Sequence, residues 1–226
     1  MSPEDPPTCR AVLWDFGGVL TTSPFEAFAR YERERGLPLG FIRGLNATNA
    51  DTNAWAKLER SEVDIAGFCT LFEAEADAAG GTVRGGEVLA LLSGDLRPAM
   101  IEALRRCKQA GLRIAMLTNN VTPTDAMADP ITGAMPSASG PHAAVLDLFD
   151  VIVESSKAGV RKPDPAAYEL VIDALVDIDP TEIVYLDDLG INLKPARAMG
   201  MRTIKVDDPD TAIAALEAAV GFPLSP

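Results

Sequence analysis

Residues 183–206 read IVYLDDLGINLKPARAMGMRTIKV, and this stretch decides the fold. It predicts a strand at 183–187, a helix at 189–199 that ends at Gly200, and a second strand at 203–206. The apolar runs are too short to form helices, and a glycine commonly follows the end of a helix. Two strands joined by a helix form a parallel β-α-β unit, so the stretch predicts a parallel sheet.

The same alternation of short apolar runs and helical stretches covers most of the chain outside residues 22–97. Most runs are rich in Val, Ile and Leu without a period-two pattern, as expected of strands covered on both faces. Asp164 and Pro165 are a typical N-cap and first residue of a helix. The further predicted strands are 11–15, 113–118 and 151–155, and the further predicted helices are 98–110, 165–176 and 209–220. We therefore expect an α/β fold with a doubly wound, Rossmann-like parallel-sheet core.

Residues 22–97 show a different pattern, with helical stretches and no convincing strand. The helices predicted there are 24–35, 53–60, 64–79 and 84–92. An inserted helical cap domain at 22–97, over one end of a core domain formed by residues 1–21 and 98–226, is the economical interpretation. The segment 121–141 is rich in Pro, Ala, Ser and Asp, and it is predicted to be a long loop over the same edge of the sheet.

Composition narrows the classes of partner. The chain has 226 residues, 47% apolar and 23% charged, which is typical of a globular protein. Its formal net charge of −13 repels phosphate backbones and anionic lipids, so neither nucleic acid nor membrane is expected as a partner. Three cysteines without CxxC spacing predict neither a disulfide framework nor a zinc site. The sequence shows no signal peptide and no apolar run of about 18 residues, so a cytoplasmic location is expected.

Polar side chains lie at the predicted carboxyl ends of the strands. In an open parallel sheet these ends share one edge, where ligands bind. The residues are Asp15, Thr118, Asn119, Asp187, Asp188 and, a few residues beyond their strands, Lys162 and Asn192. Three carboxylates at one point repel each other unless a cation is present, and oxygen ligands suit a hard divalent ion. The aspartates therefore predict a Mg²⁺ site.

A hydroxyl, a lysine and backbone N–H groups at the same edge predict a site for an anion. Thr118 and Lys162 supply the first two. A metal site, an anion site and a carboxylate together favour phosphoryl transfer over other reactions. Asp15, at the end of the first strand, is then the expected nucleophile.

Four ordered motifs, WDFGGVLT, LTNN, GVRKPDPAAYE and LDDLGINLKPARAMGM, resemble those of the haloacid dehalogenase (HAD) superfamily of aspartyl-nucleophile phosphohydrolases. The resemblance covers essentially the whole chain. The last stretch, continued through IKVDDPDTAIAALEAAVG, looks most like the N-terminal phosphatase domain of soluble epoxide hydrolases. The resemblance implies a Mg²⁺-dependent phosphomonoester hydrolase that acts on a small phosphorylated substrate through an aspartyl-phosphate. The sequence does not specify an oligomeric state, and a homodimer is compatible with it.

The resemblance also implies a role for each residue of these motifs. It makes Asp15 the nucleophile and assigns the phosphoryl oxygens to Thr118 and Asn119, while Lys162 neutralises negative charge. It assigns the metal to Asp15, Asp188 and the carbonyl of Gly17. Asp187 and Asn192 would orient the waters around that metal, and the helical cap would select the substrate.

Gly17 departs from the pattern of the phosphatases. Most of them carry an aspartate at this position, which serves as the general acid and base and is typically worth about 10²–10⁴ in rate. Its absence leaves open a slow phosphatase, a phosphatase limited to good leaving groups, or a catalytically weak protein that binds phosphorylated ligands. A haloacid dehalogenase that uses Asp15 on carbon is a further alternative, although that branch usually has a tyrosine at this position.

Overall fold

The computed structural model describes residues 8–92, 94–120 and 141–224. The loop predicted at 121–141 therefore lies outside the described residues, apart from Pro141. The described strands form one five-stranded parallel sheet in the order β3-β2-β1-β4-β5. They are β1 (Ala11–Trp14), β2 (Arg113–Thr118), β3 (Val151–Glu154), β4 (Ile183–Asp187) and β5 (Arg202–Lys205). Each strand begins and ends within one residue of its predicted range.

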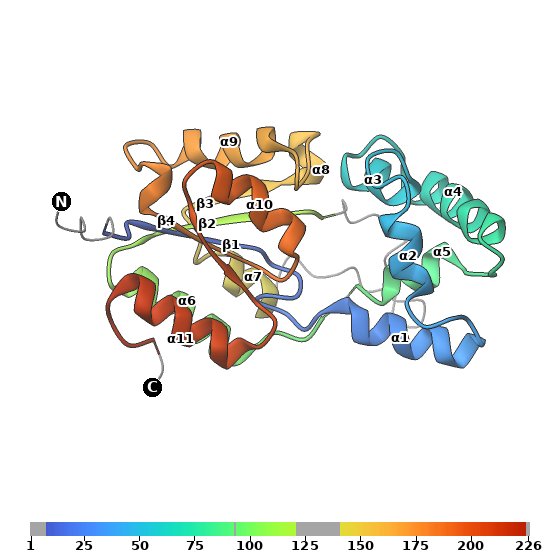
Figure 1. The fold of residues 1–226 in the computed structure, drawn as a ribbon, viewed down its shortest axis with the longest axis horizontal. Helices are drawn as coiled ribbons and strands as arrows, with labels where there is room; N and C mark the ends of the chain where they lie inside the picture. The colour runs from blue at the N-terminus through green and yellow to red at the C-terminus, as the bar shows by residue number, and fades with distance from the viewer. Residues whose placement is uncertain (1–7, 93, 121–140, 225–226) are drawn as a thin grey trace.

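Helices cover both faces of the sheet (Figure 1). On one face lie α9 (Pro165–Ala174) and α10 (Gly190–Ala198), and on the other lie α6 (Pro98–Gln109), α7 (Pro141–Leu146) and α11 (Pro209–Val220). The central strands β1 and β4 are buried along their whole length, which explains their continuous apolar sequences. The predicted doubly wound α/β fold is confirmed.

Local sequence accounts for the ends of the core helices. The side chain of Asp164 accepts a hydrogen bond from the backbone N–H of Ala166, and Pro165 opens α9. Gly111 follows the end of α6 with φ of +86°, a conformation that glycine adopts without strain. These signals are local, and the predicted helix boundaries consequently agree with the structure within two residues.

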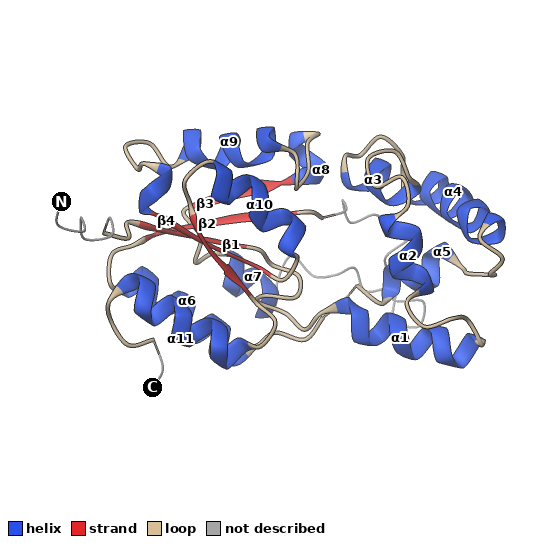
Figure 2. Ribbon diagram, in the orientation of Figure 1, coloured by secondary structure: helices blue, strands red, loops and turns tan. Residues whose placement is uncertain are grey.

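Five helices lie together beyond the carboxyl ends of the strands (Figure 1), and Figure 2 shows no strand among them. They are α1 (Pro24–Arg35), α2 (Phe41–Ala47), α3 (Ala54–Glu59), α4 (Ile65–Ala78) and α5 (Gly85–Ala90). They share an apolar core separate from the two cores of the sheet. The aromatic rings of Phe68 and Phe72 stack in it at 5.1 Å, and Trp55 packs edge-on to Phe68 at 5.2 Å.

The helix α2 was not predicted, because Gly44 and Asn46 make its sequence a weak helix former. Tertiary contacts stabilise it instead. The buried carboxylate of Glu32, on α1, accepts hydrogen bonds from the backbone N–H groups of Gly40 at 2.7 Å and Ile42 at 2.9 Å. These N–H groups lie at the start of α2, where a helix has no partners of its own for them.

Two further α-helices of the described residues were not predicted: α7 and the single turn α8 (Ser155–Ala158). Both are too short to show a helical period in the sequence. Among the described residues, no helix combines the length and the apolar character needed to cross a bilayer.

Candidate active site

Lys162 lies at the centre of the polar residues at the carboxyl edge of the sheet. Its ammonium Nζ is 2.9 Å from Oδ1 of Asp15 and 2.7 Å from Oδ2 of Asp187, and its side chain is only 1% exposed. Burial acts to lower the pKa of Lys162, but the charges of the two aspartates outweigh it and raise the pKa above its ordinary value. The lysine is therefore held as a cation between two carboxylates.

Asp15 follows β1 and keeps one oxygen available. Its Oδ1 accepts hydrogen bonds from Lys162 and from the backbone N–H of Phe16, the latter at 2.7 Å. Within the described residues, Oδ2 has no hydrogen-bond partner. Burial, together with the charges of Asp187 and Asp188, raises the pKa of Asp15 to about 7, although Lys162 opposes this.

Asp187 is fully buried, and both of its oxygens are engaged. Oδ2 accepts from Lys162 and from the hydroxyl of Tyr185, while Oδ1 accepts from the backbone N–H of Leu189 at 2.8 Å. The amide of Asn192 donates to both oxygens, at 3.0 and 3.1 Å. This carboxylate therefore orients Lys162 and is itself oriented by Asn192.

Asp188 lies beside the turn after β1. A Cβ built on Gly18 would be 2.3 Å from Oδ2 of Asp188, so glycine is needed for this close approach. One oxygen each of Asp15, Asp187 and Asp188 lie within 4.8 Å of one another. Burial first, and then the charge of Asp187, raises the pKa of Asp188 to about 6. A cluster of three carboxylates, two of which (Asp15 and Asp188) have raised pKa values, fits a hard divalent cation.

The remaining predicted residues lie at the same edge. Thr118 ends β2 and is buried, and its hydroxyl has no hydrogen-bond partner within the described part of the chain. The side chain of Asn119 bonds the backbone of Lys162: Nδ2 donates to the carbonyl at 3.0 Å, and Oδ1 accepts from the N–H at 2.9 Å. Gly17 is exposed, and a Cβ there would meet no atom of the described residues within 4 Å.

Sequence reasoning missed the tyrosines beneath the lysine. Tyr185 donates to Asp187, its ring packs edge-on to that of Tyr168 at 6.0 Å, and the Tyr168 hydroxyl donates to the carbonyl of Asn192 at 2.6 Å. A signal was available for Tyr185, because residues two apart in a strand point to the same face and it precedes Asp187 by two. Tyr168 had no comparable signal.

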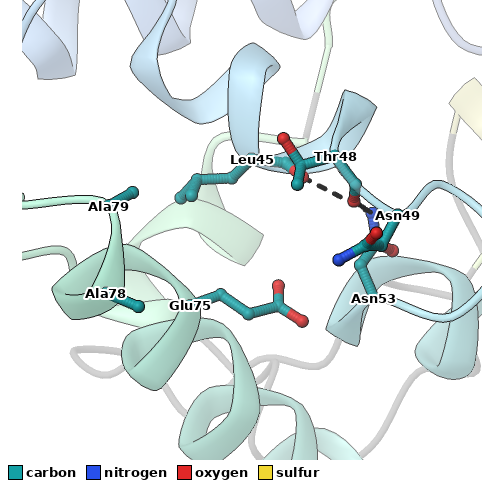
Figure 3. A pocket seen from close by; sticks show the side chains of 7 residues that line it. All are labelled: Leu45, Thr48, Asn49, Asn53, Glu75, Ala78 and Ala79. Carbon is teal, nitrogen blue, oxygen red and sulfur yellow. Dashed lines mark hydrogen bonds between the residues drawn. The ribbon is translucent and has the colours of Figure 1, made fainter.

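The helical region has a cavity of its own, of about 280 Å³, between α2, the segment that joins α2 to α3, and α4 (Figure 3). It is lined by Leu45, Thr48, Asn49, Asn53, Glu75, Ala78 and Ala79. The side chain of Glu75 reaches from α4 towards the loop that holds Asn49 and Asn53 (Figure 3). None of the residues predicted to bind metal or phosphate lines this cavity, so it is separate from the candidate active site.

Several proteins of known identity are similar in sequence to this chain. Acyl-CoA dehydrogenase family member 10 of Mus musculus is 35% identical over 95% of the chain, and bifunctional epoxide hydrolase 2 of Sus scrofa is 31% identical over 95%. The chain spans only 19% and 39% of the lengths of these two proteins. Phosphatase MT3486 of Mycobacterium tuberculosis is 31% identical over 87% of both chains.

Solved structures show the same fold. A protein of Porphyromonas gingivalis, described as a predicted HAD-like family hydrolase, superposes with a TM-score of 0.60 at 17% identity, over 94% of this chain and 98% of its own. A HAD family enzyme of Bacteroides thetaiotaomicron, in complex with magnesium and inorganic phosphate, superposes with a TM-score of 0.54 at 19% identity, over 87% and 93%.

The model of the haloacid dehalogenase-like hydrolase family matches residues 9–200. This range contains the first three sequence motifs, the fourth up to Gly200, and every residue of the cluster around Lys162. The resemblance seen in the sequence is thereby confirmed, and the chain belongs to the haloacid dehalogenase-like hydrolase family.

Proposed function

We propose that the protein is a Mg²⁺-dependent phosphomonoester hydrolase that acts through an aspartyl-phosphate on Asp15. One observation carries the proposal: Oδ1 of Asp15 is held by Lys162, while Oδ2 has no hydrogen-bond partner among the residues that the structure describes. A carboxylate fixed through one oxygen can present the other to an electrophile without reorganising. The phosphatase among the relatives, and the fold neighbour with bound magnesium and phosphate, support the same reaction.

In the first step Oδ2 of Asp15 attacks phosphorus, the new O–P bond forms, and the bond to the leaving oxygen breaks. The electron pair of that bond departs with the leaving oxygen, which takes a proton from water to form the alcohol, because Gly17 supplies no acid. Lys162 stabilises the negative charge on the transferring group and keeps Asp15 oriented. Water then cleaves the aspartyl-phosphate, which releases phosphate and restores the carboxylate.

The residues around Asp15 fit a magnesium ion, which when bound would neutralise the phosphoryl oxygens and orient the group for in-line attack. Asp15 and Asp188 would hold it with the backbone carbonyl of Gly17. Asp187 has both oxygens engaged with protein donors, so it would act on that site through Asn192 and Lys162.

Thr118 and the backbone around Asn119 would bind the phosphoryl oxygens. The hydroxyl of Thr118 is available for this, because it has no partner among the described residues. The side chain of Asn119 is engaged with Lys162, so it would contribute to phosphate binding mainly by fixing the local backbone. Thr118 ends β2 and Asn119 follows it, so one end of the sheet would present both residues to the phosphate.

We further propose that residues 22–97 form a cap domain on a core of residues 1–21 and 98–226, and that the cap selects a small phosphorylated substrate. The helical region has its own apolar core and lies beyond the carboxyl ends of the strands (Figure 1). Side chains of this region would contact the part of the substrate that lies beyond its phosphate group.

A second candidate function is binding of a phosphorylated ligand with weak catalysis. Gly17 favours it, because no side chain at that position can donate a proton to the leaving group. Both candidate functions require a bound phosphorylated ligand, and they differ in the rate at which the protein hydrolyses it.

The test is hydrolysis of p-nitrophenyl phosphate by the wild type and by Asp15→Asn, with Mg²⁺ and with EDTA. Asn has nearly the same size as Asp and cannot form the acyl phosphate. We expect activity that needs both Asp15 and Mg²⁺, and a phosphoprotein that hydroxylamine cleaves. If the wild type and Asp15→Asn hydrolyse p-nitrophenyl phosphate at the same rate and both still bind phosphate, the first candidate is wrong and the second, ligand binding, is supported. EDTA-resistant release of halide from a 2-haloacid would replace both with a dehalogenase.

A further inference from the structure

Lys162 is the last residue of a short segment, residues 155–162, which contains α8 and which we call the lysine segment. The helical region 22–97 contacts this segment directly, and Figure 1 shows α3 beside α8. The hydroxyl of Ser61 donates to the carbonyl of Ser156 at 2.8 Å. The helical region therefore contacts the segment near its start.

Arg161 makes two contacts with the helical region at the other end of the lysine segment. Its Nη1 donates to the carbonyl of Ala50 at 2.9 Å, and its Nε lies 2.6 Å from Oε2 of Glu59, the last residue of α3. The Nε and Oε2 atoms are not aligned as a hydrogen bond, so the attraction between them is that of an ion pair. One guanidinium thus bridges a backbone carbonyl and a carboxylate of the helical region.

Little solvent reaches the ion pair. The side chains of Arg161 and Glu59 are 19% and 9% exposed, and the side chain of Trp55 also bonds Glu59. Burial raises the pKa of the Glu59 carboxyl, while the positive charges of Arg161 and of the nearby Lys162 act against this. Removing one member of a buried pair leaves the other charge without compensation, which is strongly unfavourable.

The partners of Arg161 are fixed on the side of the helical region. Asn53 is the N-cap of α3, and its amide donates to the carbonyls of Asn46 at 3.0 Å and Thr48 at 2.9 Å, the latter drawn in Figure 3. One side chain thus ties the loop that carries Ala50 to the helix that ends at Glu59. Both contacts of Arg161 consequently move together with the helical region.

On the core side, Arg161 is joined by one peptide bond to Lys162. We propose that Glu59 and Arg161 are positioning residues that link docking of the helical region on the core to the placement of Lys162 beside Asp15. The inference rests on the proposed function, because it is the proposed reaction that needs the lysine there. If the helical region moves away to exchange substrate, these contacts break, and the lysine segment keeps only its bonds to the core.

The first test needs no activity. Hydrogen exchange of peptides covering 155–162, and acetylation of Lys162 by acetic anhydride, are measured on the full chain. We expect Glu59→Gln and Arg161→Met each to increase the rates of hydrogen exchange and of acetylation by about tenfold, because the remaining member of the ion pair loses its counter-charge. Two matched controls should match the wild type. Arg60→Met removes a cation that pairs within the helical region, and Lys157→Met removes an exposed cation of the segment that pairs with Glu154.

The second test is kinetic. With p-nitrophenyl phosphate and Mg²⁺ we expect kcat to fall about tenfold in Glu59→Gln and Arg161→Met, with KM changed less, because Lys162 stabilises the transition state. The double variant should lose no more than Arg161→Met alone. Arg161→Lys keeps the positive charge but only one of the two contacts, so its kcat should lie between those of Arg161→Met and the wild type. It replaces Arg161→Met in the test if that variant does not fold.

The outcomes separate the two proposals. Unchanged exchange and acetylation in a folded Glu59→Gln protein would overturn the positioning role, and so would faster exchange with the kcat of the wild type. Faster exchange in a protein whose wild type hydrolyses no phosphomonoester would support the contact and count against the proposed function alone.

Discussion

The side chain of Asn119 is bonded at both of its polar atoms to the backbone of Lys162, at 3.0 and 2.9 Å. The two residues are 43 positions apart and follow different strands. The amide therefore fixes the start of the lysine's side chain, while Asp15 and Asp187 fix its end. Lys162 is held from both directions in a buried site.

Asn119→Ala should lower kcat about tenfold or more and destabilise the fold by about 1–3 kcal/mol, because it leaves the two backbone groups of Lys162 without partners. Kinetics and chemical denaturation measure the two effects. The control is Asn120→Ala, since Asn120 bonds to Glu154 and Ser156 and makes no bond to Lys162. It should show a similar loss of stability and a smaller loss of activity, because Ser156 lies at the far end of the lysine segment from Lys162. An equal loss of activity would contradict the role of Asn119.

Gly17→Asp should fold normally and gain activity. Among the residues that the structure describes, no atom lies within 4 Å of a Cβ placed here, and the backbone is outside the left-handed region that favours glycine. An added acid and base is worth about 10²–10⁴ in rate when it is well positioned. We expect a gain of about tenfold or more on alkyl phosphates, and a smaller gain on p-nitrophenyl phosphate, whose leaving group needs no proton. No gain on either substrate would show that the proton already comes from another group.

Gly18→Ala should be far more damaging than Gly17→Ala, although the two glycines are neighbours. At Gly18 φ is +77° and a Cβ would lie 2.3 Å from Oδ2 of Asp188, so the substitution both strains the backbone and displaces a carboxylate. We expect loss of nearly all Mg²⁺-dependent activity in Gly18→Ala and a nearly unchanged Tm in Gly17→Ala. Equal behaviour of the two variants in activity and melting would contradict this geometry.

Mg²⁺ should raise the Tm of the wild type, because an ion that binds only the folded chain stabilises it by mass action. Asp188→Asn should abolish most of this shift. Differential scanning fluorimetry with Mg²⁺ or EDTA measures it without any substrate. The control Asp173→Asn removes an exposed carboxylate on α9 and should keep the full shift. If Mg²⁺ raises the Tm of all three proteins by the same amount, the ion does not bind at Asp188.

Asp150, just before β3, should stabilise the fold in a pH-dependent way. Burial acts to raise its pKa, but the N–H of Ile114, at 2.8 Å, and Lys108 act more strongly together, and the pKa lies below its ordinary value of 3.8. A carboxyl with a lowered pKa contributes stability above its unfolded pKa, and the contribution is lost as the pH falls through the folded pKa. Asp150→Asn should therefore cost about 1 kcal/mol near neutral pH.

The cost of Asp150→Asn should shrink as the pH falls below 3.8 and approach zero once the pH is below the lowered pKa of the folded state, because the wild-type carboxyl is then protonated as well. Urea denaturation at several pH values gives the difference in free energy of unfolding between the wild type and Asp150→Asn. Asp147→Asn, on an exposed residue nearby, should cost little at any pH. A difference for Asp150→Asn that stays constant down to acid pH would show that its charge plays no part.

The sequence predicted the parallel sheet and the residues at its edge because both depend on local patterns. Strand and helix alternate in the chain, and parallel strands bring their carboxyl ends to one edge, so Asp15, Thr118 and Asp187 meet there without any knowledge of packing. Helix α2 was missed for the opposite reason. Its start is stabilised by Glu32 of another helix, and no pattern within α2 carries that contact.

The amino-acid sequence by itself therefore determined the α/β fold, the membership of the family and the set of polar side chains that gather at one edge. Only the tertiary structure decided how those side chains are paired. Asn119 bonds Lys162, and Arg161 bonds the carbonyl of Ala50 from 111 residues away. A hydrogen bond or ion pair between distant residues depends on how the helices pack, and burial then sets its strength, so neither can be read from spacing along the chain.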